Sequence, residues 1–60
     1  QMALFYGHLE KVLVAVGYLE LNVPRQTMRR LQRLFNRARV DETEVQMLRG
    51  ILKAIERLKR

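Results

Sequence analysis

The chain is 60 residues long, carries twelve lysines and arginines against six acids for a net charge of +6, and contains no cysteine. A chain of this length holds one domain with a small core, because only about 60% of the unfolded surface can be buried, and no disulfide or cysteine-based zinc site can reinforce it. No apolar run approaches the roughly 20 residues that a helix needs to cross a bilayer and no signal peptide is apparent, so we expect a cytoplasmic protein without a membrane partner.

The first apolar pattern predicts a helix over residues 3–16. Its buried stripe, at mostly three- and four-residue steps, is expected to be Leu4, Phe5, Leu9, Val12, Leu13 and Val16. Gly17 suits the position just after a helix, where the backbone takes a positive φ, and either Tyr18 or Leu19 should fold back on the last turn. His8 lies in the stripe, and with no second histidine to share a metal it is interpreted as a packing residue with a local hydrogen bond.

A second helix is predicted over residues 24–38, beginning at Pro24, whose missing N–H costs nothing at the first helical position. Its expected buried stripe is Met28, Leu31, Leu34, Phe35 and Ala38. Residues 24–40 hold six arginines and no acid, so the excess of positive charge falls on this element. Arg25, Arg29, Arg33 and Arg37 form one ridge at four-residue spacing, with Arg30 beside it. Like charges at this spacing destabilise an isolated helix by about 0.2–0.5 kcal/mol per pair, so we expect the ridge to serve function.

A third helix is predicted over residues 42–59. Asp41 and Glu44 have the spacing of a capping box, and acids at the start and bases at the end complement the helix dipole. The expected buried stripe is Val45, Leu48, Ile51, Leu52, Ile55 and Leu58, and a second basic ridge is formed by Arg49, Lys53 and Arg57. Gly50 costs about 1 kcal/mol relative to alanine in a helix, and close approach of another helix is the expected compensation.

Three amphipathic helices with short connections predict an all-α fold, a small three-helix bundle. The chain has no serine and no cysteine, and the start of the third helix accounts for three of its six acids, so we predict no catalytic, cofactor-binding or metal-binding residue within it. Met2, Tyr6 and Val14 fall outside the stripe of the first helix. They indicate either a second contact surface toward another domain or chain, or ordinary exposed apolar area.

The arginine content favours a phosphate-bearing partner. Arginine outnumbers lysine nine to three, and its planar guanidinium binds phosphate in a bidentate manner and stacks on bases. The candidate RNA-binding residues are Arg25, Arg29, Arg30, Arg33, Arg37, Arg39, Arg49 and Lys53. The alternatives are a solvated charged face, a structural interaction or dimerisation module, and a small DNA-binding helical domain. The excess of arginine over lysine favours nucleic acid over a further alternative, an anionic membrane surface. Against DNA, the connection from Arg39 to Asp41 lacks a turn glycine, and the most basic helix is the second rather than the third.

Three segments in order also resemble a known family. They are Phe5-Tyr6-x-His8-Leu9-Glu10, then Pro24-Arg25-Gln26-Thr27-Met28 with Arg30-Leu31-x-Arg33-Leu34-Phe35-x-Arg37-Ala38-Arg39, and finally Leu48-Arg49-Gly50-Ile51-Leu52. In sequence and spacing they resemble the C-terminal domain of TrmJ, the bacterial tRNA (cytidine/uridine-2′-O-)-methyltransferase of the SPOUT superfamily.

The resemblance implies that residues 1–60 are the C-terminal helical tRNA-binding domain of an enzyme that modifies C or U at position 32 of the anticodon loop. It also implies an N-terminal SPOUT domain, absent from this chain, that binds S-adenosylmethionine and makes the full-length protein a homodimer. The implied partners are tRNA and that domain. No catalytic or cofactor residue of the family has a counterpart here, so the RNA-binding assignments rest on the spacing of the basic residues.

Overall fold

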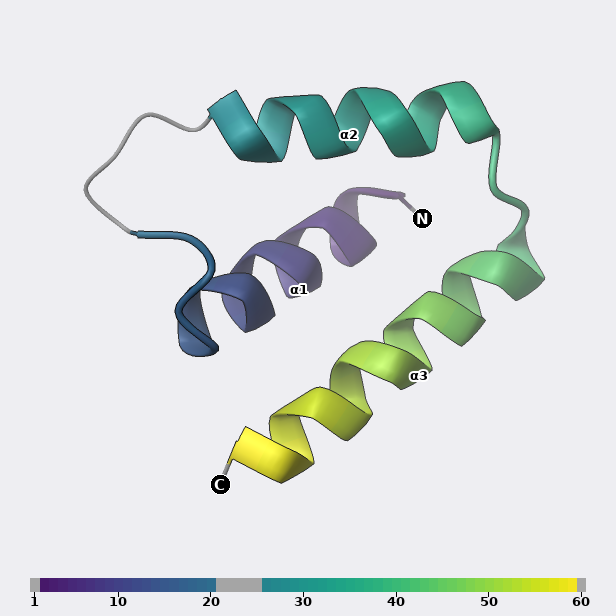
Figure 1. The fold of residues 1–60 in the computed structure, drawn as a ribbon. Helices are drawn as coiled ribbons and strands as arrows, with labels where there is room; N and C mark the ends of the chain where they lie inside the picture. Colours follow the sequence, from purple (N-terminus) through teal and green to yellow (C-terminus); the bar gives the residue numbers. More distant parts are fainter. Residues whose placement is uncertain (1, 21–25, 60) are drawn as a thin grey trace.

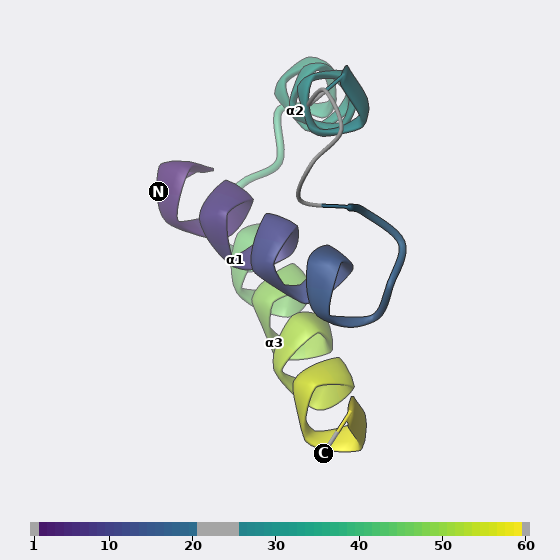
Figure 2. The same cartoon turned by 90° about the vertical axis from the view of Figure 1, so that its left-hand side faces the viewer.

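Three helices and no strand make up the described part of the chain (Figure 1). The computed structural model describes residues 2–20 and 26–59. The helices are α1 (Met2–Ala15), α2 (Gln26–Ala38) and α3 (Glu42–Lys59). The all-α, three-helix prediction is therefore confirmed. In both views of the ribbon α1 lies between α2 and α3, and Figure 2 shows α2 nearly end-on above α1.

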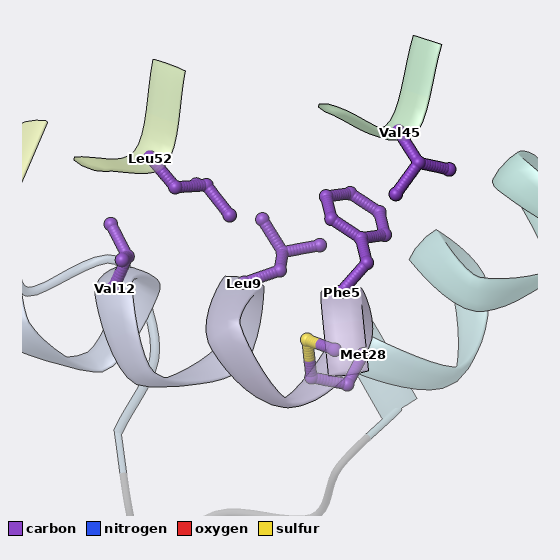
Figure 3. Packing of buried hydrophobic residues seen from close by; sticks show 6 residues of the cluster. All are labelled: Phe5, Leu9, Val12, Met28, Val45 and Leu52. Atoms are coloured by element: carbon purple, nitrogen blue, oxygen red, sulfur yellow. The ribbon is translucent and has the colours of Figure 1, made fainter. Parts of the chain in front are cut away.

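Six buried side chains form the core (Figure 3): Phe5, Leu9 and Val12 of α1, Met28 of α2, and Val45 and Leu52 of α3. The closest helix pair is α1 with α3. The core residue of α2 is Met28, and an edge-to-face contact between Phe35 and Phe5, with centroids 5.1 Å apart, adds to its attachment. Most of the circumference of α2 is therefore left to solvent.

The end of α1 is built around Gly17, as the sequence predicts. Gly17 has a φ of 88°. Its amide donates to the carbonyl of Val14 at 3.1 Å, and the amide of Tyr18 donates to the carbonyl of Leu13 at 2.9 Å. This pair of bonds is a Schellman motif. Leu19, and not the exposed Tyr18, is the side chain that returns to the core.

The start of α3 is closed by the predicted capping box. The amide of Asp41 donates to Oε1 of Glu44 at 2.9 Å, and the amide of Glu44 donates to Oδ1 of Asp41 at 2.8 Å. Val40 packs against the core just before the cap, and Val45 is buried just after it. Val40 and Val45 occupy the two positions of a hydrophobic staple, a pattern that fixes the direction in which a chain enters a helix.

Several side chains expected in the core are exposed instead: Leu4, Val16, Leu34, Ala38, Ile51 and Leu58. The reason is the flat shape of the molecule, which measures 29 × 27 × 14 Å. α2 and α3 are therefore each covered by α1 on one side only, and part of their wide apolar stripes is left uncovered.

Gly50 does not mark a close helix contact, so that expectation is wrong. The residue is exposed, and a Cβ placed on it would meet no atom within 4 Å. The exposed side of α3 also carries Met47, Ile51, Ala54 and Leu58 at four- and three-residue steps. These four residues form a second apolar stripe that lies open to solvent.

Candidate nucleic-acid interface

The arginines of α2 lie on the side of the helix turned away from the core. Met28 is buried, and Leu31 and Phe35 are half-buried against the other helices. Because successive residues of a helix are rotated by about 100°, the basic residues fall on the opposite side. Arg29, Arg30, Arg33 and Arg37 are all exposed there. The remaining predicted ridge residue, Arg25, lies outside the described residues.

Arg33 is the centre of this surface because it lines three shallow hollows. One is shared with Gln26, Arg29 and Arg30, one with Arg30 and Arg37, and one with Asn36, Arg37 and Arg39. The structure therefore joins the α2 arginines and Arg39 into one continuous surface. We call Arg29, Arg30, Arg33, Arg37 and Arg39 the arginine strip.

The charges of the arginine strip are uncompensated. Among the described residues, no carboxylate lies within ion-pairing distance of its guanidinium groups. The repulsion between arginines one helical turn apart is therefore not relieved inside the described chain. A polyanion placed along the strip would relieve it.

The predicted basic residues of α3 form a separate hollow. Arg49 and Lys53 line it together with Gln46 and Gly50, and none of its lining residues comes from α2. Arg49 is half-buried, and its Nε is shielded from solvent with no hydrogen-bond partner among the described residues. Among the described residues, the hollow of Arg49 and Lys53 is thus separate from the hollows of the arginine strip.

Tyr6 links α1 to the helix that carries the arginine strip. Its hydroxyl donates to Oδ1 of Asn36 at 2.7 Å and lies 3.1 Å from the main-chain oxygen of Gln32. Desolvation raises the pKa of the Tyr6 phenol, which is therefore a protonated donor at neutral pH. Tyr6 and Met2 both pack against the core. Their position outside the predicted stripe thus reflects contacts within the chain.

Asn36, like Gln26, lines a hollow of the arginine strip but was not predicted from the sequence. Its role depends on how α1 meets α2, because its partner Tyr6 lies 30 residues away in the chain. No local pattern in the sequence reports such a contact. An asparagine on the exposed side of a basic helix otherwise looks like any polar surface residue.

His8 has a packing role with a hydrogen bond, but its partner is distant in the sequence. Its side chain is only 12% exposed, and its Nε2 lies 3.2 Å from Oε1 of Glu56 on α3. The bond therefore joins α1 to α3 and is not local. Within the part of the chain that the structure describes, no three potential metal ligands gather, and no helix is long and apolar enough to cross a membrane.

Comparison with known proteins gives the family. The family model described as "tRNA methyltransferase TrmJ, C-terminal domain" matches residues 1–60. The chain belongs to the TrmJ C-terminal domain family. This confirms the resemblance read from its three segments.

The relatives are much longer than the chain. The tRNA (cytidine/uridine-2'-O-)-methyltransferase TrmJ of Escherichia coli strain K12 is 54% identical over 52 residues, which are 87% of this chain and 21% of that protein. The TrmJ proteins of Shigella flexneri and Shigella sonnei match with the same identity and coverage. The chain therefore spans about a fifth of the length (21%) of the curated relatives it matches. No solved structure matches this TrmJ domain.

Proposed function

We propose that this TrmJ domain binds tRNA through the arginine strip, as an accessory domain of a tRNA 2′-O-methyltransferase. The observation that carries the proposal is the strip itself: five exposed arginines side by side, with no carboxylate paired to them among the described residues. The names of the relatives, which are tRNA methyltransferases, supply the class of nucleic acid.

The dimensions of the strip suit a nucleic-acid backbone. Arg37 follows Arg29 by eight positions, which corresponds to about 12 Å at 1.5 Å per residue. A strand that carries one charge every roughly 3.4 Å along a helix axis places several phosphates over that length. Contacts to phosphate fix the position of a substrate without reading its sequence. The proposed role is therefore to hold tRNA while another domain carries out the chemistry.

The remainder of the parent enzyme has the complementary roles in this proposal. A SPOUT domain binds S-adenosylmethionine, transfers the methyl group to C or U at position 32, and holds the protein as a homodimer in the cytoplasm. These assignments come from the family resemblance and the names of the relatives. In this proposal, the role of the described residues of this chain is to hold tRNA.

Charge reversal in the strip tests the proposal. Arg33→Glu places an acid one turn from both Arg29 and Arg37, so the helix gains favourable i, i+4 pairs and should remain folded. Its matched control is Arg57→Glu, an equal change of charge at an exposed site of α3 outside the described hollows. We expect Arg33→Glu to weaken tRNA binding by about tenfold or more, because each charged contact contributes roughly 1.5–3 kcal/mol, and Arg57→Glu to change it little. Equal affinities for the two variants would contradict the assignment. Competition by duplex DNA tests the DNA alternative in the same assay.

The exposed stripe of α3 supports a second candidate function, that of an interaction module. Met47, Ile51 and Leu58 are 63%, 55% and 86% exposed. Apolar side chains aligned on one helix face are typical of contacts with another chain or domain. Sedimentation of the chain tests this candidate: a stable oligomer that does not bind tRNA would favour it over the binding role.

A further inference from the structure

We propose that the hollow at the end of α2, lined by Arg33, Asn36, Arg37 and Arg39, holds a single phosphate group of the RNA backbone. We call it the terminal hollow. In this proposal Tyr6 is a positioning residue, which orients the Asn36 amide so that its N–H groups serve the phosphate. The inference rests on the proposed function, because it names one discrete site within the tRNA-binding strip.

The orientation of Asn36 follows from its bond to Tyr6. An asparagine amide has an acceptor end, Oδ1, and a donor end, Nδ2, with two N–H groups. The Tyr6 hydroxyl donates to Oδ1 at 2.7 Å, so the acceptor end is engaged toward α1. Asn36 also lines the terminal hollow, and its Nδ2 has no bonded partner among the described residues. The donor end of the amide is therefore the end available to an occupant.

All four residues that line the terminal hollow then offer donors. The guanidinium groups of Arg33, Arg37 and Arg39 carry only N–H donors and a positive charge, and Asn36 adds two neutral N–H groups. An occupant must accept several hydrogen bonds and carry negative charge. The non-bridging oxygens of a phosphodiester satisfy both requirements, and arginine forks match their geometry.

The backbone of Arg39 supplies an independent observation. Arg39 has a φ of 54°, and its amide donates to the carbonyls of Phe35 and Asn36 at 3.2 and 3.3 Å, so it ends α2 in the left-handed conformation that favours glycine. Arg37, in the last turn, already complements the helix dipole without such strain. A strained backbone that keeps an arginine at the edge of a donor-lined hollow points to use of its side chain.

The test compares four variants of the sixty-residue chain. Tyr6→Phe keeps the ring and removes the hydroxyl that orients Asn36. Asn36→Asp replaces the donor end of the amide by an anion, and Gln46→Glu is its matched control, because it places the same charge among the basic residues of the α3 hollow. Asn36→Ala removes the amide and leaves Tyr6 close to Gln32. Affinity for tRNA is measured by fluorescence anisotropy at several salt concentrations, and thermal melting by circular dichroism checks that each variant is folded.

Loss of a neutral donor and loss of a charged donor change the salt dependence of tRNA affinity differently. Loss of the oriented amide in Tyr6→Phe or Asn36→Ala should weaken binding by about three- to tenfold at every salt concentration, with the slope of log Kd against log salt unchanged. Asn36→Asp should weaken it by more than tenfold and Gln46→Glu by about twofold or less, because only the first carboxylate faces the bound phosphate.

Wild-type affinity in Tyr6→Phe and Asn36→Ala, together with weak binding by Arg33→Glu, would contradict the proposal that the terminal hollow holds a phosphate. The tRNA-binding role of the arginine strip would then still stand. Wild-type affinity in Arg33→Glu as well would remove the proposed function itself. If Tyr6→Phe fails to fold, Asn36→Ala decides alone, because its affinity tests the amide without the Tyr6 hydroxyl being removed.

Discussion

Arg39→Gly should make the chain more stable while it weakens binding to tRNA. An L-amino acid in the left-handed conformation costs about 1–2 kcal/mol, and Arg39 is in that conformation with a φ of 54°. Glycine relieves this strain but gives the unfolded chain more conformational freedom, which lowers the free energy of unfolding by about 0.5–1 kcal/mol. The net gain is about 0.5–1 kcal/mol. For a domain of this size it corresponds to a rise in Tm of roughly 2–8 °C.

The assay is thermal and urea unfolding followed by circular dichroism, with Arg39→Ala as the control. Alanine removes the guanidinium but keeps a Cβ, so its backbone strain equals that of arginine. We expect the unfolding free energy of Arg39→Ala to lie within about 0.5 kcal/mol of that of the wild type. Arg39→Gly should have a higher unfolding free energy and a higher Tm than both. Both variants should bind tRNA more weakly, and by the same factor. A glycine variant no more stable than the alanine variant would refute the strain argument.

Three further predictions follow from the same structure. Gly50→Ala should stabilise the fold by about 1 kcal/mol in urea unfolding, because Gly50 is helical with open space around it. Gly17→Ala should destabilise the fold by about the same amount, because Gly17 has a φ of 88°. Phe5→Ala should lower the free energy of unfolding by about 3–5 kcal/mol, enough to unfold the chain, because Phe5 is 1% exposed and contacts Phe35 of α2. A cooperative thermal transition close to that of the wild type would contradict this prediction. The Tyr6 pKa is raised in the folded state, so its contribution to stability is complete below the unfolded value of about 10 and is lost as pH rises through the folded pKa. The difference in unfolding free energy between wild type and Tyr6→Phe should therefore shrink as the pH rises above about 10, and a constant difference would contradict the raised pKa.

The features that the sequence could predict are those set by neighbouring residues. The glycine stop of α1 and the Asp41–Glu44 cap of α3 each depend on contacts a few residues apart, and both are present as expected. The outward position of the α2 arginines follows from the period of its apolar residues. These features needed no knowledge of how the helices are arranged.

The features that could not be predicted depend on how the helices meet. Leu34 and Ile51 continue the apolar period of their helices, yet they are exposed because α2 and α3 are each covered on one side only. The separation of Arg49 from the arginine strip has the same origin, since it depends on the relative placement of α2 and α3. The bond from Tyr6 to Asn36 joins residues 30 apart, and no local period reports it.

The salt dependence of tRNA binding by the wild type and by Arg33→Gln tests the central claim most directly. Each phosphate contact releases condensed counterions, so log Kd should change linearly with log salt, and loss of one contact should reduce the slope by about 0.7–0.9. We expect a steep slope for the wild type and a slope lower by about that amount for Arg33→Gln. Binding that does not depend on salt, or an identical slope in the variant, would contradict a phosphate-binding role for the arginine strip.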